Sequence, residues 1–378
     1  MNTDWLSRAV PQAQKLHPYI PGKPIEQMLR EQGFDDNQIK PKISNIVKLA
    51  SNENAYGVSP KAVIAIQQAA TEVHRYPDGD CFALKQALAN EHNIEQSQLL
   101  LGNGSNEVLE LLIRCFAGAG DDVIYSQRGF IVYALATAAA GAHGLVVPEK
   151  DGYGHDLKAM AAAVTDKTKV VCIANPNNPT GSLLGTSELQ LFLNQLPRDL
   201  IVILDEAYYE YVADEIEDSI HALKYPGLIV SRTFSKAYGL AGCRVGYAVA
   251  NQDLLAVVNR FREPFNVNML AQHAAMAALS DKTWVLDKVK SCKEERTHLE
   301  EALRQRNCLA VKSYANFVLL QSTKCAELVT LLEKQDIIVR PLAAYGMADV
   351  LRISVGTSEE NQRFLQALDI SFEELAVI

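Results

Sequence analysis

Four loops in the middle of the sequence carry side chains that can do chemistry. The segment SRTFSKAYGLAGCRVG (231–246) places Lys236 among small and hydroxyl-bearing residues, directly after an apolar run that suits a buried strand. A lysine in such a loop can lose its proton and form a Schiff base with a carbonyl group. Thr233, Ser235 and Arg244 would together hold a phosphate dianion, with Arg244 binding it through two hydrogen bonds. For this segment alone, a solvated surface lysine is the ordinary alternative.

The other three loops also follow strand-like runs and read LGNGSNE (101–107), NPNNPTG (175–181) and DEAY (205–208). Ser105 and Asn106 would open a helix, and the free N–H groups of a helix N-terminus attract phosphate. Two prolines make the second loop rigid, which suits an amide such as Asn178 that must point at a ligand. Asp205 would be costly at the end of a buried strand without a cationic ring nitrogen or a protein cation beside it. Glu206 could serve a structural bond, and each loop also has an ordinary structural interpretation.

The elements around these loops alternate between strands and helices. Short apolar runs predict strands at 98–101, 122–125, 170–174, 200–204, 228–231 and 245–250. Helical spacing of apolar residues falls at 59–73, 108–116, 132–140 and 187–195. This order is typical of an α/β domain with a mostly parallel sheet. Ligands of such sheets bind outside the carboxyl ends of the strands, so the four loops should gather at one edge.

Both ends of the chain depart from that alternation. The first forty residues are rich in Pro, Gly and charge, and we expect a partly extended arm with one short helix. A long helical stretch is expected over about 269–306, followed by strands at 317–321 and 351–355 that flank a helix at 326–334. We therefore predict an N-terminal arm (1–45), a large domain (46–268) and a small α+β domain (269–378).

The composition is that of an ordinary globular protein. Hydrophobic residues make up 48% of the 378 positions and charged residues 21%, which excludes a disordered chain or a small disulfide scaffold. The net charge of −9 disfavours nucleic acid as a partner. The most apolar window, 131–147, is too short and too broken for a membrane span. Seven cysteines without a CxxC pair, and no signal-type N-terminus, indicate a cytoplasmic protein. The histidines lack metal-site spacing, so no metal is expected.

Taken together and in order, Asn178 in NPNNPTG, Asp205 in DEAY, and Lys236 with Ser235 and Arg244 resemble the pyridoxal-phosphate (PLP) aminotransferases of the aspartate aminotransferase fold type. Further segments are similar to histidinol-phosphate aminotransferases, namely PYIPGKP (18–24), KLASNENAYG (48–57), RYPD (75–78), PFNVN (264–268) and LRISVGT (351–357). The resemblance spans nearly the whole chain. It implies fold type I, with a mostly parallel central sheet between helices and a smaller α+β domain. It also implies pyridoxal 5′-phosphate as cofactor and a homodimer with shared active sites.

The resemblance assigns roles around the cofactor. Lys236 would form the Schiff base and move a proton between the substrate α-carbon and the cofactor C4′. Asp205 would pair with the protonated pyridine nitrogen, and this charge makes the ring an electron sink. Asn178 and Tyr208 would hydrogen-bond the phenolic oxygen, and Phe130 would stack on the ring. The phosphate would be held by Ser105, Asn106, Thr233, Ser235 and Arg244, and by Tyr56 of the neighbouring subunit.

The resemblance also names residues for an amino or keto acid and a phosphorylated substrate. Arg352 would bind the α-carboxylate in a planar fork. Arg340 lies where the similar enzymes bind the substrate phosphate. Tyr19 would help from the other subunit, and Asn54 would line the pocket. These residues imply the conversion of imidazole-acetol phosphate and glutamate to histidinol phosphate and 2-oxoglutarate, in histidine synthesis.

Three alternatives stay open. An aromatic amino acid aminotransferase would use the same scaffold, a PLP-dependent amino acid phosphate decarboxylase would break another bond, and a non-catalytic regulator would keep only the fold. The sequence departs from the family pattern at Ala55, Asn106, Cys243 and the segment SQRG (126–129), which bears on substrate preference more than on mechanism. Arg128 in that segment adds a charge near the expected ring that the resemblance does not explain.

Overall fold

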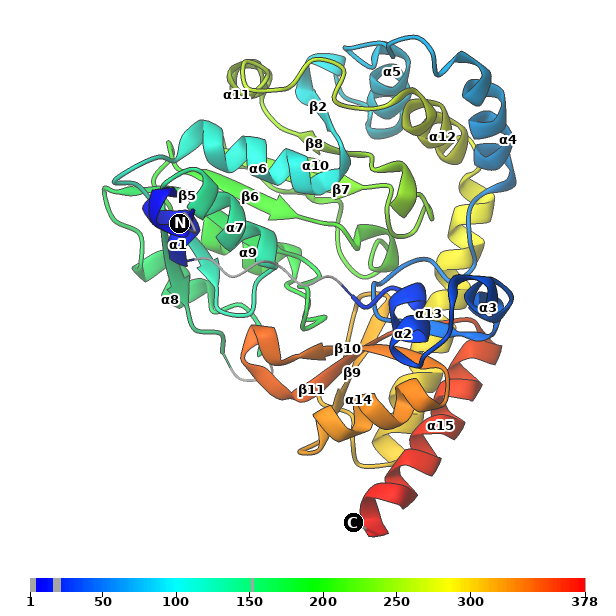
Figure 1. Cartoon of the computed structure of the whole chain (residues 1–378). Helices are drawn as coiled ribbons and strands as arrows, with labels where there is room; N and C mark the ends of the chain where they lie inside the picture. Colours follow the sequence, from blue (N-terminus) through cyan, green and yellow to red (C-terminus); the bar gives the residue numbers. More distant parts are fainter. Residues whose placement is uncertain (1–4, 16–21, 151–152, 378) are drawn as a thin grey trace. The chain divides into compact units, whose positions relative to one another are not determined.

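The computed structural model describes residues 5–15, 22–150 and 153–377, and the chain forms two compact units (Figure 1). The large unit consists of Met1–Pro18, Val58–Asn178 and Ser182–Leu286, and the small unit consists of Tyr19–Gly57, Pro179–Gly181 and Asp287–Ile378. Each unit has its own sheet and its own apolar core. Among the described residues, no helix has the length and apolarity that a membrane crossing requires. The predicted domain boundaries stay a prediction.

The large unit is built on a seven-stranded sheet with the order β2-β8-β7-β6-β5-β3-β4. Its strands are β2 (Leu99–Gly102), β3 (Asp122–Ser126), β4 (His143–Val147), β5 (Thr168–Ala174), β6 (Ile201–Asp205), β7 (Leu228–Thr233) and β8 (Gly246–Val249). Only β8 pairs in the antiparallel sense with its neighbours. The prediction of a mostly parallel sheet is therefore confirmed, and the six predicted strands all exist.

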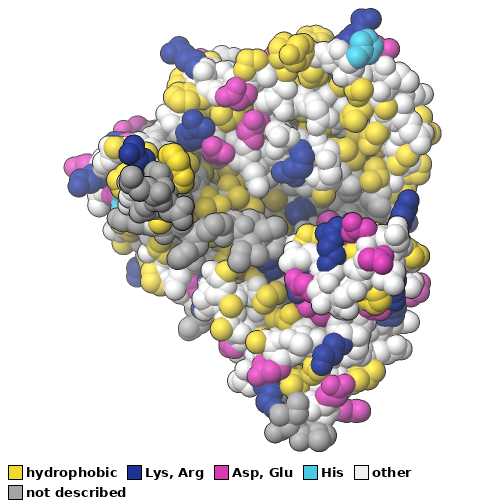
Figure 2. Space-filling model, in the orientation of Figure 1, with side chains coloured by type: hydrophobic (Ala, Val, Ile, Leu, Met, Phe, Trp, Pro, Cys, Tyr) yellow, Lys and Arg dark blue, Asp and Glu magenta, His cyan; other side chains and the backbone are white. Residues whose placement is uncertain are grey.

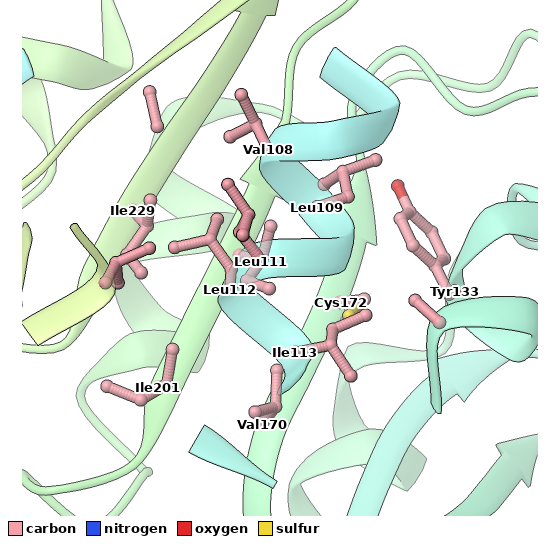
Figure 3. Close-up of a cluster of buried hydrophobic side chains, with 14 of the residues drawn as sticks. Val108, Leu109, Leu111, Leu112, Ile113, Tyr133, Val170, Cys172, Ile201 and Ile229 are labelled. Atoms are coloured by element: carbon pink, nitrogen blue, oxygen red, sulfur yellow. The ribbon is translucent and has the colours of Figure 1, made fainter. Parts of the chain in front are cut away.

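Helices cover both faces of this sheet because successive side chains of each strand point in opposite directions. On one face α6 (Gly104–Phe116), α7 (Ile131–Ala139) and α11 (Gln252–Val258) pack against residues such as Ile201 and Ile229, as Figure 3 shows for α6. On the other face α8 (Leu157–Ala162) and α9 (Thr186–Leu193) cover Val202 and Leu204. Strands buried on both sides read as continuous apolar runs, which is why they were recognisable in the sequence.

The other helices of the large unit are α1 (Pro11–Lys15), α4 (Pro60–Ala69), α5 (Phe82–His92), α10 (Ser219–Ala222) and α12 (Met269–Leu279). Helices α4, α5 and α12 share one apolar cluster with β2 and β8. The short α1 lies against α7. This arrangement leaves the carboxyl ends of β5, β6 and β7 beside one another, since these three strands are parallel neighbours.

The small unit holds a four-stranded sheet with the order β1-β10-β11-β9. Its strands are β1 (Val47–Leu49), β9 (Phe317–Gln321), β10 (Ile337–Leu342) and β11 (Met347–Ser354), and its helices are α2 (Ile25–Glu31), α3 (Asp36–Lys42), α14 (Cys325–Lys334) and α15 (Ser358–Val377). Helices α2 and α3 place Met28, Leu29 and Ile39 against Ile338 of β10. Helix α13 (Lys282–Gln305) begins in the large unit and ends in the small unit.

The helical stretch expected over 269–306 consists of two helices, because α12 ends at Leu279 and α13 begins at Lys282. Between them the Asp281 carboxylate accepts a hydrogen bond of 2.6 Å from the Ser59 hydroxyl. The N-terminal region holds α1, α2 and α3 where one helix was expected. A capping box formed by Asp35 and Gln38 starts α3 and was readable in the sequence.

Candidate active site

Asp205 is the last residue of β6 and lies buried at the carboxyl edge of the large sheet, with 4% of its surface exposed. The Tyr133 hydroxyl donates a hydrogen bond of 3.0 Å to its Oδ2. Its Oδ1 is buried and has no hydrogen-bond partner within the described part of the chain. Burial raises the pKa of Asp205 to about 6, although the Tyr133 hydroxyl, the Ala207 N–H and the charge of Lys236 act in the opposite direction. A buried carboxylate with one open oxygen is suited to a cationic ligand.

Lys236 follows the neighbouring strand β7 and belongs to the same site as Asp205. Its Nζ lies 5.8 Å from the centre of the Tyr208 ring. Tyr208 itself is buried in the loop after β6. The structure therefore brings Lys236, Asp205 and Tyr208 together, as expected from their places after adjacent parallel strands.

A cradle for an anion forms where Arg244 meets the first turn of α6. Arg244 adopts the left-handed conformation with φ 58°, and its guanidinium packs so closely on Gly104 that a Cβ there would collide with it. The same guanidinium donates to the Ser235 hydroxyl at 3.4 Å. Thr233 donates to that hydroxyl at 3.1 Å. These contacts gather one cation and two hydroxyls in a single place.

The N-terminus of α6 completes the cradle. Gly246 of β8 has no side chain, and a Cβ at this position would lie 2.5 Å from the backbone nitrogen of Ser105. Ser105 is buried, whereas Asn106 in the same turn is exposed. Free N–H groups at the start of a helix of 13 residues favour a phosphate, so the cradle matches a phosphate in charge and in donors.

The loop after β5 holds its amides in place by hydrogen bonds. The side chain of Asn175 donates to the carbonyl of Leu184 at 3.1 Å and accepts from its N–H at 2.8 Å. Asn177 donates to the carbonyl of Arg128 at 3.0 Å. Asn178 follows in this rigid loop. Phe130 caps α7 and makes an edge contact with Tyr133, the residue that bonds Asp205, at 6.0 Å between ring centres.

The small unit carries two arginines side by side. Arg340 of β10 and Arg352 of β11 are paired residues of antiparallel strands, and both are largely buried. Arg352 donates to the carbonyl of Ala50 at 3.1 Å. Since like charges directly opposite each other in a sheet repel, this pair is suited to an anionic ligand.

Two further predicted residues lie near each other in the small unit. The Asn54 side chain accepts a hydrogen bond of 3.0 Å from the backbone N–H of Tyr56. Burial raises the pKa of Tyr56 to about 12, so its hydroxyl keeps its proton at neutral pH. Tyr19 lies outside the described residues.

Comparison with known proteins identifies the family of this chain. The family model for aminotransferase class I and II matches residues 44–368. The chain belongs to this family. Fold type I, predicted from the sequence, is thereby confirmed. The cofactor of this aminotransferase family is pyridoxal 5′-phosphate, again as predicted.

Several relatives are similar over nearly their whole length. The chain is 47% identical to a histidinol-phosphate aminotransferase of Methylobacillus flagellatus, over 93% of this chain and 94% of the relative. It is 46% identical to histidinol-phosphate aminotransferase 2 of Pseudomonas aeruginosa, over 97% and 98%. A crystal structure of histidinol-phosphate aminotransferase from Sinorhizobium meliloti in complex with pyridoxal-5′-phosphate superimposes with a TM-score of 0.86, at 29% identity over 98% of each chain.

Tyr133 is a site residue of this aminotransferase that the sequence analysis missed. It lies on α7 one turn after Phe130, is fully buried, and reaches Asp205 through its hydroxyl. The signal was present, because a buried tyrosine needs a partner for its hydroxyl and α7 is otherwise almost entirely apolar. Sequence alone did not say which acid that partner is.

The structure explains the extra charge of Arg128. Its guanidinium forms an ion pair with Glu149 and lies 4.8 Å from the centre of the Tyr153 ring. Arg128 thus binds the segment after β4 to the loop after β3. In the described ranges, no group of three or more His, Cys, Asp or Glu residues is placed to hold a metal ion.

Proposed function

We propose that this aminotransferase exchanges an amino group between histidinol phosphate and 2-oxoglutarate, yielding imidazole-acetol phosphate and glutamate in histidine biosynthesis. Relatives that carry this name are 45–47% identical over nearly the full chain. The observation that carries the proposal within the structure is the pairing of Arg340 with Arg352 on adjacent strands. One arginine suits the phosphate of the first substrate, and the other suits the carboxylate of the second.

The residues of the large unit fit pyridoxal phosphate. The open Oδ1 of Asp205 is a partner for a protonated ring nitrogen, since a buried carboxylate without a cation is costly. The cradle of Arg244, Ser235, Thr233 and Ser105 has the donors that a phosphate requires. Asn106 is the weakest member of the proposed set because its side chain is exposed.

Each side chain then has a task in the reaction. The bound cofactor draws electrons away from the α-carbon of the substrate. Lys236 would hold the cofactor through its amine and, once released by the substrate, would take the proton from the α-carbon and deliver it to C4′. Asp205 would pair with the protonated ring nitrogen. Asn178 and Tyr208 would donate hydrogen bonds to the phenolic oxygen and so favour its ionised form. Phe130 would pack on the face of the ring.

The substrate residues belong to the small unit in this proposal. Arg352 binds the α-carboxylate of glutamate or 2-oxoglutarate in a planar fork. Arg340 binds the phosphate of histidinol phosphate. Asn54 lines the pocket, and Tyr56 reaches the site of the neighbouring subunit.

We also propose a homodimer with shared active sites, working in the cytoplasm. Tyr76 is 81% exposed and stacks on Phe265, itself 44% exposed, at 4.7 Å between ring centres. Figure 2 shows further hydrophobic side chains gathered over α4, α5 and α12. An exposed apolar surface of this kind supports a protein partner. Light scattering should give the mass of two chains, and Tyr76→Glu with Phe265→Glu should give one.

A single half-reaction tests the function. The cofactor-loaded protein is mixed separately with histidinol phosphate, L-phenylalanine and L-glutamate, and conversion to the pyridoxamine form is followed by visible absorbance. Fast conversion by histidinol phosphate and glutamate, with phenylalanine slow, is expected. Faster conversion by phenylalanine would instead identify an aromatic aminotransferase. No conversion by any of them would contradict the proposal and direct attention to decarboxylation.

A further inference from the structure

A buried arginine that the proposed mechanism does not use lies behind the cofactor site. Arg232 occupies the position before Thr233 in β7, with 2% of its surface exposed. Its Nε and Nη2 donate to the Oε2 of Glu206 at 3.0 and 2.7 Å. Nη2 also donates to Asp218 at 2.6 Å. The guanidinium stacks on the Tyr209 ring at 3.5 Å.

Strand alternation places this arginine on the face of the sheet opposite to the cofactor residues. Ile229 of β7 packs in the same cluster as Ile203 of β6, whereas Val230 packs in the cluster on the other face. Arg232 shares the face of Val230, and Asp205 shares the face of Ile203. Arg232 and Asp205 therefore lie on neighbouring strands, back to back across the sheet.

The main chain at this point is fixed without the arginine. The N–H of Glu206 donates to the carbonyl of Ser231 at 2.8 Å, and the N–H of Asn175 donates to the carbonyl of Asp205 at 2.8 Å. Neither of these bonds involves the guanidinium of Arg232. What this side chain adds to the region is its charge and its ion pairs.

The charges around the arginine favour its role as a neutralising group. Burial raises the pKa of Asp205, and the negative charge of Glu206 raises it further. Burial also raises the pKa of Glu206, and the charge of Arg232 opposes this. The other titratable groups that interact with Arg232 are Asp218, Tyr209, Glu210, Tyr238, Tyr247 and His92. One guanidinium thus pairs with two carboxylates, of which Glu206 is the chain neighbour of Asp205.

We propose that Arg232 is a positioning residue of the cofactor site, whose guanidinium pairs with Glu206 and Asp218 behind the sheet and so keeps the Asp205 carboxylate ionised for the ring nitrogen of the cofactor. The inference rests on the role proposed for Asp205. Without Arg232, an unneutralised Glu206 stands beside Asp205 in a medium of low dielectric constant. Asp205 then takes up a proton and can no longer pair with a cationic nitrogen as an anion.

The affinity of the cofactor-free protein for two ligands tests this role. One ligand is pyridoxal phosphate, and the other is its 1-deaza analogue, in which carbon replaces the ring nitrogen. Both are titrated by absorbance, and the ratio of the two dissociation constants reports the bond to Asp205. A hydrogen bond to a charged group predicts a ratio of about tenfold to a hundredfold for the natural protein. Asp205→Asn, the reference without the charge, should bring the ratio close to one.

Arg232→Gln should lower the ratio of the two dissociation constants towards one. A merely structural defect would instead weaken the binding of both ligands equally. The double variant Arg232→Gln with Glu206→Gln removes the unneutralised charge and should recover most of the ratio. The double variant can also be measured by itself if Arg232→Gln fails to fold. Lys85→Gln is a matched control, since Lys85 is a buried cation paired with Asp80 at 2.6 Å in α5. Its ratio should equal that of the natural protein.

Two failures have different meanings. If the natural protein binds both ligands equally, the role of Asp205 in the proposed function is wrong. If the natural protein prefers pyridoxal phosphate over the deaza analogue and Arg232→Gln shows the same preference, only the inference about Arg232 is overturned. A ratio close to one in the double variant would also overturn the inference about Arg232, because removal of the Glu206 charge would then not restore the preference for pyridoxal phosphate.

Discussion

Asp205→Asn should make the cofactor-free protein more stable at neutral pH while it destroys the cofactor site. The substitution keeps the shape of the side chain and removes its charge. The pKa of Asp205 is raised from 3.8 to about 6 in the folded protein. A difference of about two pKa units corresponds to about 3 kcal/mol of free energy of unfolding at most. The asparagine oxygen can still accept the hydrogen bond from Tyr133.

The pH dependence follows from the sign of this shift. A group whose folded-state pKa is raised binds its proton more tightly in the folded protein than in the unfolded chain. Its ionisation therefore costs stability as the pH rises from about 4 to about 6, and the cost is complete above that range. The advantage of the asparagine variant should be full at pH 8 and should shrink as the pH falls through this window.

Urea unfolding of the two cofactor-free proteins at one protein concentration measures the difference. The variant should unfold at higher urea at pH 8, and the two midpoints should approach each other near pH 5. Addition of pyridoxal phosphate should stabilise the natural protein more than the variant, since the stabilisation by a ligand grows with the logarithm of its affinity. A variant less stable than the natural protein at pH 8, or an advantage that does not depend on pH, would refute the account of Asp205 as a costly buried charge.

Four further changes test the site and the core. Lys236→Ala should abolish turnover, and full turnover in the standard half-reaction would exclude its proposed role. Arg340→Ala should weaken the binding of phosphorylated substrates far more than that of phenylalanine. An equal rise in KM for both would exclude Arg340 from the phosphate site. Tyr133→Phe should raise the pKa of Asp205 further, seen as a weaker preference for pyridoxal phosphate over its deaza analogue, whereas an unchanged preference would show that the hydroxyl is not needed. Leu112→Ala in the core of α6 should cost about 2–5 kcal/mol of unfolding free energy, measured in urea, and a cost below 1 kcal/mol would contradict its packing.

The large sheet was predictable because its physical cause is local. Strands covered on both faces need unbroken apolar runs, as in Val170–Ala174, and the loops that follow them must lie at one edge. The strand β10 at Ile337–Leu342 was missed. It carries Pro341, a residue that argues against a strand, and Arg340, which is buried without looking apolar. The break after α12 was missed because the helical pattern of apolar residues continues across it.

Partners in space were not predictable from spacing. Asp205 and Glu206 are adjacent acids after the same buried strand, and either could have held a ligand or a protein cation. The structure separates them, since Glu206 contacts Arg232 while Asp205 contacts the Tyr133 hydroxyl. Strand alternation sends these two neighbours to opposite faces, and the distribution of the other charged side chains then decides their chemistry. The acid that meets a protein cation is structural, and the acid that is left with an open oxygen can receive the cofactor.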